Sequence, residues 1–188
     1  MTKYVKVMFG TKSGASDFQY QIGKVNYSQN WNPNATNGKD FGGFNYTTED
    51  CIVRWLHRGD TIYDVTIPDG AENITIDGAT KIYRTNQIIL TNPRPVTDDL
   101  ALHFYQIAKI SENAYYKALG AVSIMNYPKT AFAIIKDKVS LTNIDTVLAE
   151  WNDFIYHHGK ADRVNSTKLV KIVTQKLNDI KKTNIKIN

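Results

Sequence analysis

Hydrophobic and polar residues alternate over several short stretches in the first half of the chain. A period of two is the pattern of a strand with one buried face. It predicts strands over residues 3–9, 18–23, 44–47, 61–67 and 81–90, with a brief further pair at Ile74 and Ile76. The polar, Asn- and Gly-rich stretch 28–43 is typical of a loop.

A single helix interrupts this series of strands, over residues 49–58. Its apolar positions include Ile52, Val53 and Leu56. Thr47 or Thr48 can cap the first turn, and Gly59 is placed to end the last one.

The period changes from two to that of a helix after the proline-containing segment 92–95, which we expect to close the first unit as a stiff joint. Apolar residues then recur every three or four positions. Helix starts are predicted at Thr97, Ser111, Pro128, Ser166 and a capping-box-like segment Thr142-Asn143-Ile144-Asp145, and helix ends at Asn126 and Gly159. The last helix has Leu169, Val173, Leu177 and Ile180 on one stripe.

Strands followed by helices indicate the α+β class. We expect a small, mainly antiparallel β-rich platform domain with one helix over residues 1–96. We expect helical hairpins with a basic C-terminal segment over residues 97–188.

The composition bears on the cellular location of the chain. A single cysteine, Cys51, excludes an intrachain disulfide and favours a reducing, intracellular location. We expect no membrane association, because no apolar run reaches the length of a spanning helix and the N-terminus does not resemble a signal peptide.

The formal net charge of +5 is concentrated near the C-terminus, where residues 160–188 hold eight basic and two acidic side chains. Such a cluster can bind nucleic acid through phosphate contacts. A solvated helix face is the alternative, favoured by the scarcity of arginine and of interleaved aromatic residues. The residues concerned are Lys168, Lys171, Lys176, Lys181 and Lys182.

Residues 3–92 resemble a known viral domain. The matching elements are Phe18-Gln19-Tyr20, the segment from Gly42 to Thr48, Tyr63-Asp64-Val65-Thr66-Ile67-Pro68 and the segment from Lys81 to Leu90. In this order they are similar to the N-terminal domain of ankyrin-repeat proteins of mimivirus-type giant viruses, and of related viral proteins of unknown role. The resemblance implies a location in the cytoplasm of an infected cell or in a virion. The Thr-Pro-Leu-His signature of ankyrin repeats is absent, although residues 114–139 have the cadence of one helical repeat.

The strand that enters the predicted helix also resembles part of the ADP-ribosyltransferase fold. On that analogy Tyr46, Thr47 and Thr48 line an NAD pocket, and Arg84 meets a phosphate. Transfer chemistry of this kind needs a carboxylate or a histidine to stabilise developing charge, and the segment 81–90 contains neither.

Other motifs of known chemistry are missing from the sequence. His57 is better read as a helix-terminal residue, and adjacent residues such as His157 and His158 point about 100° apart on a helix. No phosphate loop or calcium loop occurs. We therefore expect no metal and no cofactor.

The leading hypothesis is a non-enzymatic, viral protein-binding scaffold, with a protein partner or a second copy of the chain bound by the helical hairpins. NAD binding by an enzyme or its inactive relative, and nucleic-acid binding through the C-terminal segment, are the alternatives. Exposed aromatic residues are the expected contacts, because they bury large areas at low entropy cost. The candidates are Tyr115, Tyr116, Tyr127 and Tyr156, with Trp151 expected in the core.

Overall fold

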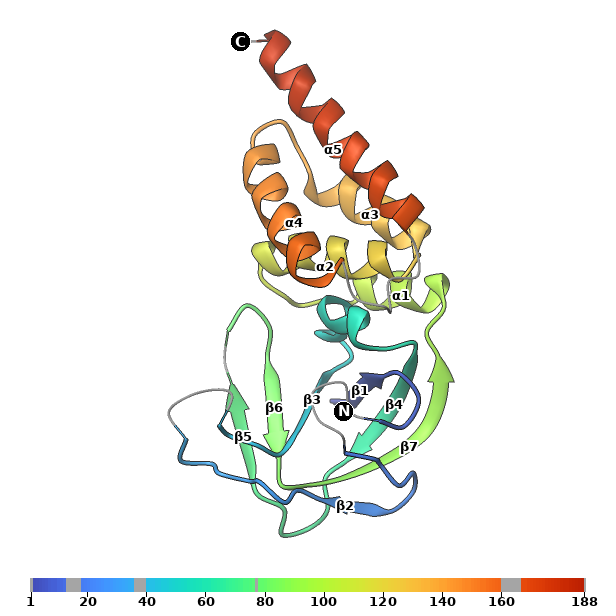
Figure 1. Ribbon diagram of the computed structural model, residues 1–188, viewed down its shortest axis with the longest axis vertical. Coiled ribbons are helices and arrows are strands. Elements are labelled where there is room, and N and C mark those ends of the chain that lie inside the picture. The colour runs from blue at the N-terminus through green and yellow to red at the C-terminus, as the bar shows by residue number, and fades with distance from the viewer. Residues whose placement is uncertain (1, 13–17, 36–39, 77, 160–166, 188) are drawn as a thin grey trace. The chain divides into compact units, whose positions relative to one another are not determined.

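The computed structural model describes residues 2–12, 18–35, 40–76, 78–159 and 167–187 (Figure 1). The chain divides into two compact units. The sheet unit comprises Met1–Ile52 and Arg58–Val96, and the helical unit comprises Val53–His57 and Thr97–Asn188. The α+β class predicted from the sequence is confirmed, with a β-rich N-terminal part followed by helices.

Seven strands form one antiparallel sheet among the described residues, in the order β2-β7-β4-β1-β3-β6-β5. Strand β1 therefore lies in the middle of the sheet, as Figure 1 shows. The strands are β1 (Tyr4–Met8), β2 (Val25–Tyr27), β3 (Phe44–Thr48), β4 (Thr61–Thr66), β5 (Asn73–Ile76), β6 (Ile82–Thr85) and β7 (Gln87–Pro95).

One face of the sheet holds an aromatic core. Successive residues of a strand point to opposite faces, so Tyr4, Lys6 and Met8 share this face while Val5 and Val7 are buried on the other. The buried members of the core cluster are Met8, Tyr20, Phe44, Tyr46, Tyr63, Val65, Ile88 and Leu90.

The predicted strand 81–90 is two strands, β6 and β7, broken at Asn86. The Asn86 amide donates to the Glu72 carbonyl (3.2 Å), and its carbonyl accepts from the Ser28 amide (2.8 Å). Its side-chain oxygen also accepts from the Glu72 amide (2.9 Å). These bonds to distant segments turn the chain from one strand partner to the next.

Strand β7 also continues through the segment that we predicted to be a joint outside the sheet. Pro95 lies opposite Thr61, and Arg94 lies opposite Ile62. The register shifts beside Asn92, which has a φ of 50°. Proline is tolerated here because the partner on the other side, β2, extends along β7 only to Ile89.

The segment 18–23 is not a strand, and β2 was not predicted. Phe18 and Tyr20 nevertheless pack into the aromatic core. The side chain of Asn26 in β2 fixes the segment, accepting from the Gln21 amide (2.8 Å) and donating to the Gln21 carbonyl (3.1 Å).

The predicted helix 49–58 is a shorter 3₁₀ helix, η1 (Ile52–Arg58). Because η1 starts at Ile52, neither Thr47 nor Thr48 is the residue that precedes it. The hydroxyl of Thr47 donates to the Lys81 carbonyl (2.6 Å), and that of Thr48 bonds the Asp50 carboxylate. Gly59 is needed for close packing and not for a left-handed cap. A Cβ there would lie 2.1 Å from the carbonyl carbon of Met8.

The helical unit contains five described α-helices, which are α1 (Asp98–Gln106), α2 (Glu112–Ile124), α3 (Pro128–Lys138), α4 (Ile144–His158) and α5 (Thr167–Ile187). Helix α2 packs against α3, α4 and α5, and α1 packs against α3. A Cβ at Gly120 of α2 would lie 2.3 Å from the ring of Phe154, so glycine lets α4 approach closely.

Helix boundaries follow local signals in most places. Thr97 caps α1 by accepting from the Leu100 amide (3.2 Å). Asn126 ends α2 with a φ of 62°, as predicted, and the Tyr127 amide donates back to the Val122 carbonyl (2.9 Å). Asn143 is the N-cap residue of α4, but its side chain makes no capping hydrogen bond. The predicted capping box is therefore wrong. The predicted cap at Ser166 lies outside the described residues.

Candidate functional site

A shallow groove of about 600 Å³, mostly open to solvent, lies between α3 and α5 in the helical unit. Phe132 of α3 lines one side. The other side is formed by α5, with Lys171, Ile172, Gln175, Lys176 and Asp179. It is the best candidate site in the described part of the chain, because it joins apolar surface with charge.

Helix α5 is amphipathic, and this places its groove residues. Leu169, Val173 and Leu177 are buried, as the predicted stripe requires, and Ile180 is half-buried. The rotation of the helix then turns Lys171, Ile172 and Gln175 outward.

Helix α3 is amphipathic in the same sense. Ala131, Ile134 and Ile135 are buried against the unit, which leaves Phe132 and Lys136 on the outer side. Phe132 is 39% exposed, and Ile172 across the groove is 43% exposed. Two large apolar side chains from different helices therefore face solvent in one depression, an arrangement that favours binding of apolar surface.

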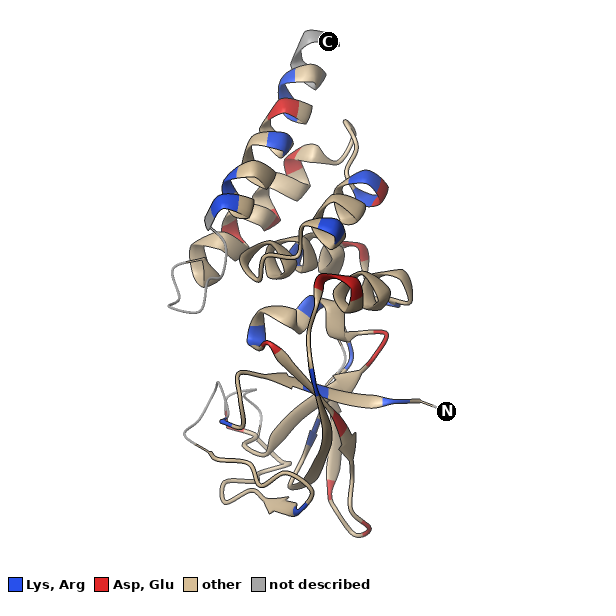
Figure 2. Cartoon of the chain, turned by 90° about the vertical axis from the view of Figure 1, so that its right-hand side faces the viewer, with Lys and Arg blue, Asp and Glu red and all other residues tan. Residues whose placement is uncertain are grey.

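Two of the three charged residues that line the groove are lysines. Figure 2 shows in blue that basic residues recur along α5. Lys171 and Lys176 line it, and the exposed Lys136 and Lys168 lie on the same two helices. The described residues provide no ion pair for any of these four lysines. We call these four side chains the lysine rim.

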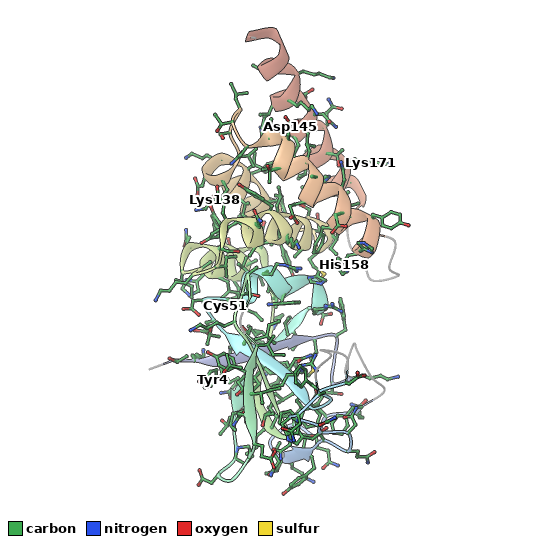
Figure 3. All side chains as sticks on the ribbon, turned by 90° about the vertical axis from the view of Figure 1, so that its left-hand side faces the viewer. Tyr4, Cys51, Lys138, Asp145, His158 and Lys171 are labelled. Carbon is green, nitrogen blue, oxygen red and sulfur yellow. The ribbon has the colours of Figure 1, made fainter. Side chains whose placement is uncertain are left out.

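The remaining predicted lysines are engaged within the chain. Lys181 pairs with Asp145 at the start of α4 (2.9 Å), and Lys182 lies 3.8 Å from Asp179. Asp179 also accepts from the Gln175 amide group (2.8 Å). Figure 3 labels Lys171 and Asp145 on their helices. Lys168, Lys171 and Lys176 therefore have no ion pair among the described residues, whereas Lys181 and Lys182, further along α5, are paired with carboxylates.

The four tyrosines predicted as partner contacts differ in how exposed they are. Tyr116 and Tyr127 are buried, so the expectation that they are exposed is wrong. Tyr115 is half-buried, donates to the Ala108 carbonyl (2.9 Å) and lies under the Lys138 amine (4.3 Å to the ring centroid). Tyr156 is 68% exposed on α4. Trp151 is in the core, as expected.

The hydroxyl groups of the NAD alternative do not converge on one surface. Tyr46 faces the aromatic core and donates to the Asn73 side chain (2.9 Å), whereas Thr47 points to the opposite face of β3. Arg84 donates to the Gly42 carbonyl (3.4 Å) and lies over the Phe41 ring, and burial lowers its pKa.

Lys6 is a basic residue that sequence reasoning missed. Its amine donates to the Asn45 carbonyl (2.6 Å) and lies 5.4 Å from the centroid of the Tyr20 ring. Burial, and then the charge of Arg84, lower the pKa of this amine to about 8. The alternation of residues 3–9 contained the signal, because it places Lys6 between Tyr4 and Met8 on the core face.

The remaining candidates for chemistry are dispersed. The described residues contain no group of three or more His, Cys, Asp or Glu side chains that could hold a metal ion. His57 is buried beside the rings of Phe154 and His158, whereas His157 lies 3.4 Å from Asp153 on the surface of α4. Cys51 is buried and forms no disulfide with a described residue. Within the same residues, no helix combines the length and the apolar character needed to cross a membrane.

Comparison with known proteins finds no matching family model, no matching curated protein and no matching solved structure. The resemblance of residues 3–92 to the mimivirus-type domain therefore stays a prediction.

Proposed function

We propose that this chain is a non-enzymatic protein-binding scaffold whose partner surface is the groove between α3 and α5. The observation that carries the proposal is the joint exposure of Phe132 and Ile172 in one depression, which is also lined by Lys171 and Lys176, two lysines with no ion pair among the described residues. Binding energy at protein interfaces comes mainly from a few apolar or aromatic anchors, with polar groups around them.

The sheet unit supports this proposal by its lack of an assembled reactive site among the described residues. The hydroxyl groups of Thr47 and Tyr46 are engaged with Lys81 and Asn73, on opposite faces of β3. We propose that this unit serves as a rigid platform. A viral setting is part of the proposal and rests on the resemblance of residues 3–92 alone.

The test is affinity purification from the native source with the full chain as bait. The matched variant carries Phe132→Ser and Ile172→Ser, and the control carries Tyr27→Ser, which removes an exposed aromatic residue of the sheet unit. We expect at least one protein to be recovered with the wild type and with the control, and lost with the groove variant. Equal recovery by all three baits would contradict the proposal.

A titration with NAD tests the enzymatic alternative separately. We expect no saturable binding at micromolar NAD. Saturable binding that is lost on Thr47→Val would replace the scaffold proposal with a nucleotide-binding one.

A further inference from the structure

We propose that the groove between α3 and α5 binds an acidic amphipathic helix of a partner protein. This inference rests on the proposed function and names the chemistry of the partner. It follows from the groove's apolar residues, from the charges around it, and from the kind of backbone that two helices can accept.

The apolar residues define one side of the ligand. Phe132 and Ile172 are each about two-fifths exposed and come from different helices, so a ligand that touches both must lie in the groove between them. Covering this surface is favourable at about 25 cal/mol for each Å² removed from water. The ligand therefore needs an apolar stripe.

The charged residues around the groove indicate which residues should flank the apolar stripe of the ligand. The lysine rim, Lys136, Lys168, Lys171 and Lys176, has no described ion-pair partner. The carboxylate that lines the groove, Asp179, is already bound by Gln175 and lies near Lys182. Carboxylates on both sides of an apolar stripe would complement this arrangement and speed association.

The backbone of the ligand must satisfy its own hydrogen bonds. The outer faces of α3 and α5 offer no unpaired backbone groups, since the amides and carbonyls of a helix interior bond one another. An extended peptide would leave its backbone groups without partners in the groove, whereas a helix brings them already paired. Recognition by anchors spaced three and four residues apart is the known mode for such grooves.

Two other occupants fit less well. Nucleic acid gains little from Ile172, meets the Asp179 carboxylate in the groove, and finds no arginine on α5. A second copy of the chain would bring an identical lysine rim against this one, because a two-fold interface pairs the same patch with itself. Like charges at such a contact oppose association.

The test measures the fluorescence anisotropy of a labelled synthetic peptide with the full chain. The probe is a designed helix of about 16 residues, four to five turns long, with Leu at three- and four-residue spacing and Glu on the remaining face. We expect saturable binding with a Kd between about 10 and 500 µM, because a short peptide covers little area and pays for its ordering. Binding should weaken as salt is raised.

Two groove variants and matched controls locate the site. Phe132→Ser with Ile172→Ser removes the apolar residues, and Lys171→Glu with Lys176→Glu inverts part of the rim. Each should weaken binding at least tenfold. The double variant Lys12→Glu with Lys24→Glu makes the same change in net charge on exposed residues of the sheet unit, and Tyr27→Ser removes an exposed aromatic there. Both controls should bind as the wild type does, with circular dichroism verifying that every variant is folded.

Four results would overturn the inference. They are an absence of binding at about 1 mM peptide, wild-type affinity in both groove variants, equal binding of an acidic peptide with permuted Leu positions, and tighter binding of a basic analogue or of single-stranded DNA that depends on Lys171 and Lys176. If the peptide fails while the purification still recovers a groove-dependent protein, the scaffold function stands and only the partner's chemistry is wrong. If both fail, the groove is not a partner surface.

Discussion

The carboxylate of Asp98 caps a helix to which it does not belong, by accepting from the Thr130 amide (3.1 Å) in the first turn of α3. The same carboxylate accepts from the Lys129 amide (2.8 Å) and from the Thr130 hydroxyl (2.9 Å). Helix α3 has no capping bond from its own boundary residue, Tyr127. The first turn of α1 therefore supplies what the start of α3 lacks, and a negative charge at a helix N-terminus is favourable.

Asp98→Ala should lower the free energy of unfolding by about 1 to 2 kcal/mol, because it leaves amides at the start of α3 without a partner. Urea denaturation followed by circular dichroism measures the loss. The neighbouring Asp99→Ala is the control. Among the described residues the Asp99 side chain makes an exposed ion pair with Lys129 (2.7 Å), and its removal should cost much less than the removal of Asp98. Equal losses in the two variants would contradict the capping role.

Lys6 should make stability rise with pH above neutrality. Its folded-state pKa of about 8 lies below the ordinary value of 10.5, so the unfolded chain binds more protons between these values. Folding is therefore opposed by Lys6 at low pH and relieved of this cost as pH rises from 8 to 10.5. Relative to Lys6→Met, the free energy of unfolding of the wild type should rise by about 1 to 2 kcal/mol between pH 8 and 10.5. This is less than the full pKa difference would give, because the Lys6 side chain is partly exposed.

Comparing wild type with Lys6→Met cancels the contributions that the two proteins have in common. Denaturant unfolding at several pH values between 7 and 11 gives the difference. Parallel stability curves for the two proteins would show that the amine is as well solvated in the folded chain as in the unfolded one.

Asp64 should contribute stability that is lost in acid. The hydrogen bond from Arg94 (2.8 Å), with a second from Asn92 (2.9 Å), lowers the pKa of this carboxylate to about 2 from 3.8. The contribution is fully present above pH 4 and disappears as pH falls towards 2. Asp64→Asn should lose about 1 to 2 kcal/mol at pH 6 and little at pH 2, measured by denaturant unfolding. A pH-independent difference would be inconsistent with this linkage.

Gly120→Ala should destabilise the helical unit by about 1 to 3 kcal/mol, because the added methyl group would overlap the Phe154 ring. Combining it with Phe154→Leu tests the cause, since a smaller side chain removes the overlap. The double variant should lose less than the sum of the two single losses, measured as a double-mutant cycle. If the losses of stability in the two single variants simply added in the double variant, the overlap with Phe154 would not be the cause.

Features that depend on neighbouring residues were predictable from the sequence. Thr97 and Asn126 were correctly identified as helix boundaries because each acts within one turn of the chain. The buried stripe of α5 was predictable for the same reason, since helical geometry alone places Leu169, Val173 and Leu177 on one side.

Features that depend on distant residues were missed. Strand β2 has only three residues and exists through its pairing with β7 and the bonds of Asn26. The break at Asn86 is made by Glu72 and Ser28, which are remote in sequence. The groove could not be predicted either. Individual exposed lysines were visible in the pattern, but the meeting of Phe132 with Ile172 depends on the placement of α3 beside α5.

The burial of α2 has a consequence for the evolution of this chain. Nine residues of this helix are buried. They are Ala114, Tyr116, Ala118, Leu119, Gly120, Ala121, Val122, Ser123 and Ile124. Descendants of a common ancestor should vary most at exposed positions outside the groove, while keeping this inner segment nearly constant. Distant homologues of the chain would then be recognised best by the pattern of small residues in α2.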